Sequence, residues 1–232
     1  MTALSKKART AGLLYILSSL FGVVRLIYIP SMLIVHGNAS ATANNIASHE
    51  LLFRVGVVSY LLGSALWIFV ALALYRLLKG VNQALAVLMV IGSLVVTPIF
   101  FVNAANDAAA LLFARGADFL SVFDKAQREA FVMLFLNLHH QLDLANFLGG
   151  SWWFIPFGLL VFRSTFLPRI LGVWLMLACF VYLAVSLSAL LYPAYTDKVW
   201  TFAQPVLLAE VATMLWLAFM GAKEKSLAAG RS

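Results

Sequence analysis

The stretch FLNLHHQLDLANF, residues 135–147, combines polar side chains with helical spacing. His139, Asp143 and Asn146 follow one another at i, i+4 and i+7 and share one face of a helix, whereas His140 lies about 100° around it. A histidine and a carboxylate one turn apart can bind one metal ion if further ligands come from elsewhere. The same pair can also contact or titrate with a small molecule or ion. A third interpretation needs no site, because side chains at headgroup level are satisfied by water, lipid and each other.

The composition indicates that membrane-spanning helices position this stretch. The chain has 232 residues, of which 63% are hydrophobic and 11% charged, and its mean hydropathy is +0.97. Its apolar runs are continuous, which argues against the alternating pattern of a β-barrel. The net charge of +7 is concentrated at the ends of apolar segments, without a basic face interleaved with aromatics, so nucleic acid is not an expected partner.

We predict an all-α, polytopic membrane bundle of six helices that forms one domain over residues 1–232. Each span is long enough to cross about 30 Å of hydrocarbon at about 1.5 Å per residue. The spans are expected at residues 10–33, 52–78, 84–106, 144–162, 170–192 and 205–221. The long extracytoplasmic connections are expected at residues 35–51 and 107–143. No small-residue cleavage site directly follows the first apolar run, so we interpret that run as an uncleaved helix.

Basic residues predict the orientation of these spans. Ten of the sixteen lysines and arginines fall on one side of the membrane under this topology: Lys6, Lys7, Arg9, Arg76, Lys79, Arg163, Arg169, Lys223, Lys225 and Arg231. Positively charged connections stay in the cytoplasm. We therefore expect a multi-pass protein of the inner (plasma) membrane with both termini cytoplasmic.

Counting from these basic anchors places further polar groups in the outer half of the membrane. Arg25 lies about 24 Å from Arg9, and Glu210 about 20 Å from Lys223. A charge in hydrocarbon costs about 2.5–3.5 kcal/mol on the insertion scale, so such groups usually face the bundle interior and pair. Arg25 needs an acid, and Asp107, Asp143 and Glu210 are the candidates. We expect an outward-opening pocket walled by the first, third, fourth and sixth spans. Its candidate ligand-binding or ion-binding residues are Arg25, Asn103, Asp107, His139, Asp143, Asn146 and Glu210.

The chain resembles a family of bacterial multi-pass membrane proteins catalogued as a domain of unknown function. The resemblance rests on RTAGLLYILSSLFG, ATANNIASHELLFRVG, LALYRLLKGVNQALAVLM, FRSTFLPRILGVWLMLACFVYLAVSL and AEVATMLWLAFMG. Leu138-His139 and Glu210 resemble a leucine–histidine step and a last-span glutamate of that family. The doubled histidine and GGSWW, residues 149–153, depart from its pattern. The resemblance implies a compact six-helix unit in the bacterial inner membrane and no particular reaction.

The leading functional hypothesis is binding of a small molecule, lipid headgroup or ion in the outward-facing pocket, for transport or sensing. Arg25 would be the buried cation, with Glu210 as its counter-ion or as a proton-carrying acid, while His139 and Asp143 contact the ligand or titrate.

Two alternatives remain open, although we favour a protein that is not an enzyme. One is a membrane hydrolase acting on lipid, with zinc held by His139, Asp143 and Glu210 and activating a bound water. The other is a structural or assembly partner without a site.

No HExxH, cysteine-pair or ATP-binding motif is present, so no cofactor is expected unless zinc is bound. The expected partners are membrane lipids and a small-molecule or ion ligand, and the oligomeric state is left open.

Overall fold

A computed structural model describes residues 2–222, and within this range every regular element is helical. Six helical stretches there are long and apolar enough to cross a membrane. They are Ala3–Leu33, Glu50–Leu78, Gln83–Arg115, Lys125–Arg163, Arg169–Leu191 and Pro193–Met220. The prediction of a six-span, all-α membrane protein is therefore confirmed. The cations Lys223, Lys225 and Arg231 lie outside the described residues.

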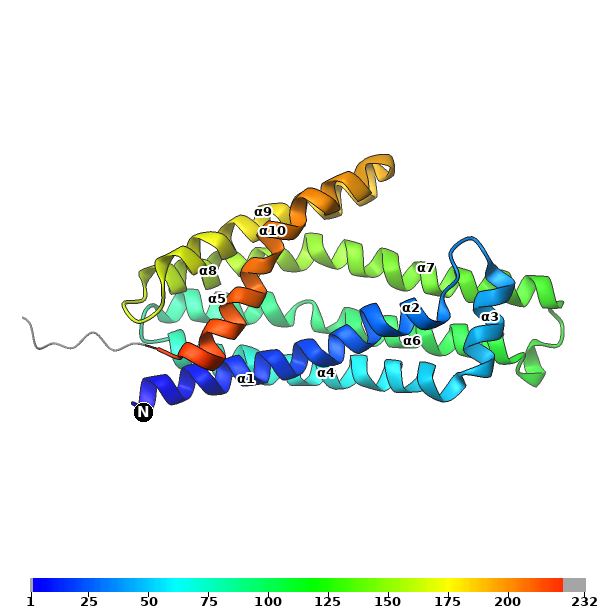
Figure 1. The fold of residues 1–232 in the computed structure, drawn as a ribbon, viewed down its shortest axis with the longest axis horizontal. Coiled ribbons are helices and arrows are strands. Elements are labelled where there is room, and N and C mark those ends of the chain that lie inside the picture. The colour runs from blue at the N-terminus through cyan, green and yellow to red at the C-terminus, as the bar shows by residue number, and fades with distance from the viewer. Residues whose placement is uncertain (1, 223–232) are drawn as a thin grey trace, which may run out of the picture. The chain divides into compact units, whose positions relative to one another are not determined.

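Most spans consist of more than one helix (Figure 1). The elements of the first half are α1 (Ala3–Val23), the π-helical η1 (Val24–Tyr28), α2 (Ile29–Leu33), α3 (Ala39–Ser48), α4 (Glu50–Leu78), α5 (Gln83–Leu94) and α6 (Thr97–Arg115). Those of the second half are η2 (Asp118–Leu120), α7 (Lys125–Gly150), η3 (Ser151–Trp153), α8 (Phe154–Arg163), α9 (Arg169–Leu191), η4 (Pro193–Tyr195), α10 (Thr196–Leu215) and the π-helical η5 (Trp216–Met220).

The helices form two compact units. Unit A contains residues 2–17, 66–96 and 144–222 of the described range, and unit B contains residues 18–65 and 97–143. Each unit has its own apolar core, which explains why each is compact by itself. A hydropathy profile finds the spans but carries no information about which halves of them pack together.

Small residues bring the helices of unit A close together. Helices α8 and α9 lie side by side (Figure 1), and a Cβ added at Gly158 would lie 2.6 Å from the backbone oxygen of Gly172. Large side chains fill the spaces next to such contacts: Trp153 stacks on Phe157 with 5.2 Å between ring centroids, and Trp152 and Trp153 cover Gly92. Close packing of small against large residues is how membrane helices gain van der Waals contact.

The segment expected as a long connection at residues 107–143 is largely helical. Helix α6 continues to Arg115, and α7 already begins at Lys125. A reciprocal capping box starts α7, because Asp124 Oδ1 accepts from the Gln127 backbone N–H at 2.8 Å and Gln127 Oε1 accepts from that of Asp124 at 2.9 Å. The helix of the fourth span therefore begins well before residue 144, since hydropathy marks the apolar part of a helix and not its end.

The other differences concern where helices begin and end. The connection at residues 35–51 contains α3, whose N-cap Asn38 accepts from the Ala41 backbone N–H at 2.9 Å. The third span extends from Gln83 to Arg115, beyond the expected end at residue 106. The last span begins before residue 205, because α10 starts at Thr196 and contains Pro205 in its interior.

The close approach of α8 and α9 gives a first testable prediction. Gly158→Ala places a methyl group against backbone that cannot rotate away, so it should destabilise the protein by about 1–3 kcal/mol. Thermal unfolding in detergent, followed with a thiol-reactive dye, would measure this through Cys179, which is the single cysteine of the chain and is buried. Gly149→Ala is the matched control, because a Cβ there meets open space, and its effect should stay within about 1 kcal/mol. Equal melting temperatures for Gly158→Ala and the wild type would contradict the packing argument.

Candidate functional site

A buried ion pair lies at the centre of unit B. Arg25 is 4% exposed, and Asp107, on α6, is fully buried. The Arg25 Nε donates to Asp107 Oδ2 at 2.7 Å, and Nη2 donates to Oδ1 of the same carboxylate. Arg25 lies in η1, and π-helical segments within longer helices are frequent at functional sites. The counter-ion of Arg25 is thus Asp107 and not Glu210, which corrects that part of the expectation.

His139 joins this pair to a second carboxylate. Its Nδ1 lies 3.1 Å from Asp107 Oδ1 and 3.3 Å from Arg25 Nη2, and its Nε2 lies 3.3 Å from Asp143 Oδ2. Both ring nitrogens therefore face a carboxylate oxygen. An imidazolium ion donates from both nitrogens, whereas a neutral ring donates from one only. The formal charges of Arg25, His139, Asp107 and Asp143 cancel when His139 is protonated.

Asp143 is held in turn by side chains of α4 and α6. Its Oδ1 accepts from the Tyr60 hydroxyl at 2.9 Å and from Asn103 Nδ2 at 2.8 Å. Tyr60, on α4, was missing from the residues predicted for the site. Depth counting could have found it, because Tyr60 precedes Arg76 by as many residues as Arg25 follows Arg9, about 24 Å along each helix.

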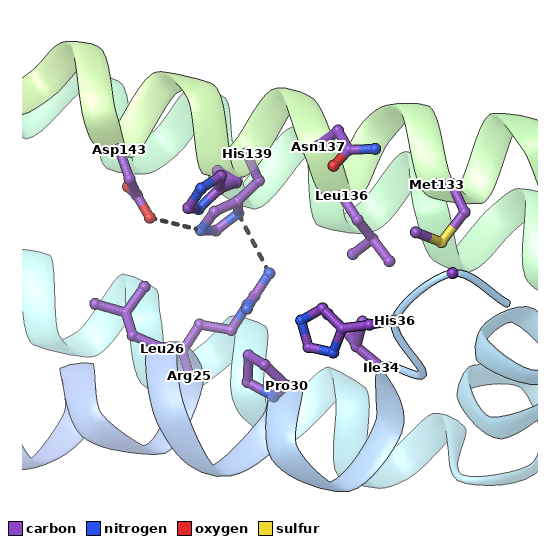
Figure 2. Close-up of a pocket in the computed structure, with 12 residues that line it drawn as sticks. Arg25, Leu26, Pro30, Ile34, His36, Met133, Leu136, Asn137, His139 and Asp143 are labelled. Carbon is purple, nitrogen blue, oxygen red and sulfur yellow. Dashed lines mark hydrogen bonds and ion pairs between the residues drawn. The ribbon is translucent and has the colours of Figure 1, made fainter. Parts of the chain in front are cut away.

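A pocket of about 460 Å³ opens beside this network within unit B. Figure 2 shows Arg25 extending from the first span towards His139 on α7, with Asp143 on the far side of the imidazole. The polar lining consists of Arg25, His36, Asn137, His139, His140 and Asp143. The rest of the lining is Leu26, Pro30, Ile34, Gly37, Met133 and Leu136. The pocket thus combines an apolar wall with several nitrogen-containing groups.

Of the residues predicted for the site, unit B brings together Arg25, Asn103, Asp107, His139 and Asp143. Asn146 and Glu210 belong to unit A. There, Glu210 accepts hydrogen bonds from the Tyr15 hydroxyl on Oε1 and from the Tyr182 hydroxyl on Oε2, the latter at 3.4 Å. Glu210 therefore has neutral phenol partners in place of the arginine that the sequence suggested.

The described part of the chain contains no group of three or more His, Cys, Asp or Glu residues that could hold a metal ion. His139 and Asp143 lie together in unit B, while Glu210 is engaged by two tyrosines of unit A. The residue set considered for zinc therefore lacks a third ligand in unit B.

The chain belongs to the family described as domain of unknown function DUF4386, whose model matches residues 10–221. This match agrees with the resemblance seen in the sequence and with a polytopic membrane protein. No curated protein and no solved structure matches the chain.

The buried ion pair gives a second prediction. Asp107→Asn leaves the Arg25 charge without a counter-ion and should cost about 3–5 kcal/mol of stability, as should Arg25→Gln. Arg25→Gln/Asp107→Asn should cost clearly less than the sum of the two, because it removes both charges. Denaturant unfolding in micelles measures all three variants. Glu50→Gln is the control, since it breaks only solvent-accessible pairs, with Arg54 at 2.7 Å and with Arg115 at 3.1 Å, and should cost at most about 1 kcal/mol. Strictly additive costs would show that the two side chains act independently.

Proposed function

We propose that the protein binds a small molecule, lipid headgroup or ion in the pocket of unit B, for transport or sensing. One observation carries the proposal: the polar wall of the pocket includes Arg25, His139 and Asp143, members of a buried network of charged groups. Ionisable groups in membrane-spanning helices are costly, and they commonly mark substrate or ion pathways.

The groups left free by the network define the chemistry of the ligand. Asp143 already accepts from Tyr60 and Asn103, and the Arg25 guanidinium is engaged by Asp107. The exposed polar side chains at the pocket are His36, Asn137 and His140, which can offer N–H donors. An acceptor-bearing group such as a carboxylate or phosphate fits these donors, and the apolar lining suits a hydrocarbon portion of the same ligand.

We further propose that the protein lies in the bacterial inner membrane with both termini in the cytoplasm. The support is the position of the basic residues, since Lys6, Lys7, Arg76 and Lys79 all lie near helix ends on the side expected to be cytoplasmic. Labelling of His36→Cys and Lys79→Cys with a membrane-impermeant thiol reagent on intact cells tests this orientation.

Glu210 would serve as a proton-carrying acid in a transport cycle. Its carboxylate accepts from two phenols, Tyr15 and Tyr182, and has no cationic partner among the ion pairs of the described residues. A carboxyl group among neutral partners can exist as the acid or as the carboxylate without breaking a salt bridge.

The binding proposal predicts a bound ligand on the gently extracted protein. Native mass spectrometry should detect one organic or lipid adduct on the wild type, and His140→Leu should reduce its occupancy at least fivefold because it removes an N–H donor at the pocket. His49→Leu is the matched control, since this exposed histidine does not line the pocket, and it should retain the adduct.

The same experiment separates the alternatives. A stoichiometric metal adduct that disappears in Asp143→Asn would replace the binding proposal with the metal-dependent lipid hydrolase. A bare protein mass in every sample would favour a structural or assembly role without a site.

The proton-carrying role of Glu210 predicts loss of coupling without loss of fold. Glu210→Gln should abolish uptake of the ligand identified by mass spectrometry into proteoliposomes under an imposed proton gradient. It should leave the melting temperature within a few degrees, because the amide oxygen can still accept from one phenol and the amide NH2 can donate to the hydroxyl oxygen of the other. Unchanged gradient-driven uptake by this variant would remove Glu210 from the mechanism.

A further inference from the structure

A second hollow, in unit A, has a different chemistry from the pocket of unit B. It has a volume of about 430 Å³ and lies between α1 and α4. Three cations line one end of it: Lys6 and Lys7 from the first turns of α1, and Arg76 from the last turn of α4. All three are exposed, and none takes part in an ion pair with an acidic side chain among residues 2–222. This groove therefore presents concentrated positive charge that no acidic side chain of the described residues neutralises.

The remainder of the groove is apolar or small. Leu14 on α1 and Phe69 and Leu72 on α4 form its walls, while Thr10 and Ala73 are small enough to leave the hollow open. Each helix contributes one stripe, because Lys6, Thr10 and Leu14 are spaced by four, and Phe69, Leu72 and Arg76 by three and four. The charged end and the apolar end are separated by about 10–12 Å along each helix.

A groove with a cationic end and an apolar remainder matches one class of ligand. A free anion would use the cations but not the exposed Phe69 and Leu72 side chains. An acyl chain alone would leave the three charges without a partner. A membrane phospholipid with a net negative headgroup satisfies both ends, and basic pockets between membrane helices are known to select such headgroups.

We infer that the groove between α1 and α4 is a binding site for an anionic phospholipid. Lys6, Lys7 and Arg76 contact the headgroup phosphate, and Leu14, Phe69 and Leu72 contact the first part of an acyl chain. The site does not depend on the ligand of unit B, since the two hollows share no lining residue.

The test is lipid binding to the delipidated full-length protein, measured by native mass spectrometry with dioleoyl-phosphatidylglycerol as the probe. The wild type should bind one such lipid at least tenfold more tightly than dioleoyl-phosphatidylcholine, and glycerol phosphate should not compete at equal concentration. Lys6→Gln/Lys7→Gln/Arg76→Gln should lose at least tenfold in affinity for the anionic lipid. The matched control is Lys79→Gln/Arg163→Gln/Lys198→Gln, which removes the same number of lysines and arginines outside the groove and should lose less than threefold.

A second variant keeps the charges and blocks the apolar part. Thr10→Phe fills the groove from an exposed position and should also weaken the anionic lipid at least tenfold, so the proposal stays testable if the triple variant does not fold. Equal binding of the two lipids to the wild type would overturn the proposal. An equal loss of affinity for the anionic lipid in the groove triple variant and the control triple variant would also overturn it. Full competition by glycerol phosphate would assign the site to a free phosphate compound in place of a lipid.

Discussion

The bidentate pair between Arg25 and Asp107 is the interaction on which the structure of unit B depends. A guanidinium inside a membrane helix is tolerated only with a counter-ion, so η1 and α6 must meet at this level. Asp107 also accepts from His139, and the imidazole brings α7 to the same point. Asp143 then faces the second ring nitrogen, and Tyr60 completes the sequence of contacts from α4. Each side chain of the network thus gives the preceding one a hydrogen-bond or ion-pair partner. Together these contacts fix the relative positions of η1, α4, α6 and α7.

Unit A is organised by a different kind of contact. Gly158 and Gly172 allow α8 and α9 to approach until backbone touches backbone, and Trp153 packs edge-on against Trp67 with 5.5 Å between centroids. Trp152 and Trp153, which lie in the GGSWW segment that departs from the family pattern, belong to this packing and not to the lining of the unit B pocket. Packing by shape stabilises helices without imposing a charge requirement. Among the described residues, the hydrogen-bond partners of Glu210 are accordingly the neutral phenols of Tyr15 and Tyr182.

The sequence predicts the six spans well, because they follow from the length and hydropathy of the apolar runs. Counting residues from the basic anchors predicts Arg25 and Asp107 at one depth in the membrane. It does not say towards which neighbouring helix each side chain points, so it could not choose among Asp107, Asp143 and Glu210 as the counter-ion. That choice depends on which faces of the helices meet, which is a tertiary property. The early start of α7 is a different kind of miss, since the capping residues Asp124 and Gln127 are visible in the sequence and hydropathy alone ignores them.

The two hollows differ in how their charge is compensated, and this difference decides what each can attract. In unit B the cations and carboxylates lie within contact of each other, so little net charge remains to attract an ion from a distance. Selection there must come from hydrogen-bond geometry at short range, which suits a specific ligand. In the groove of unit A, Lys6, Lys7 and Arg76 have no acidic partner in the described chain. Their field extends to about the Debye length, which favours any negatively charged headgroup over a neutral one and makes the groove selective for charge more than for shape.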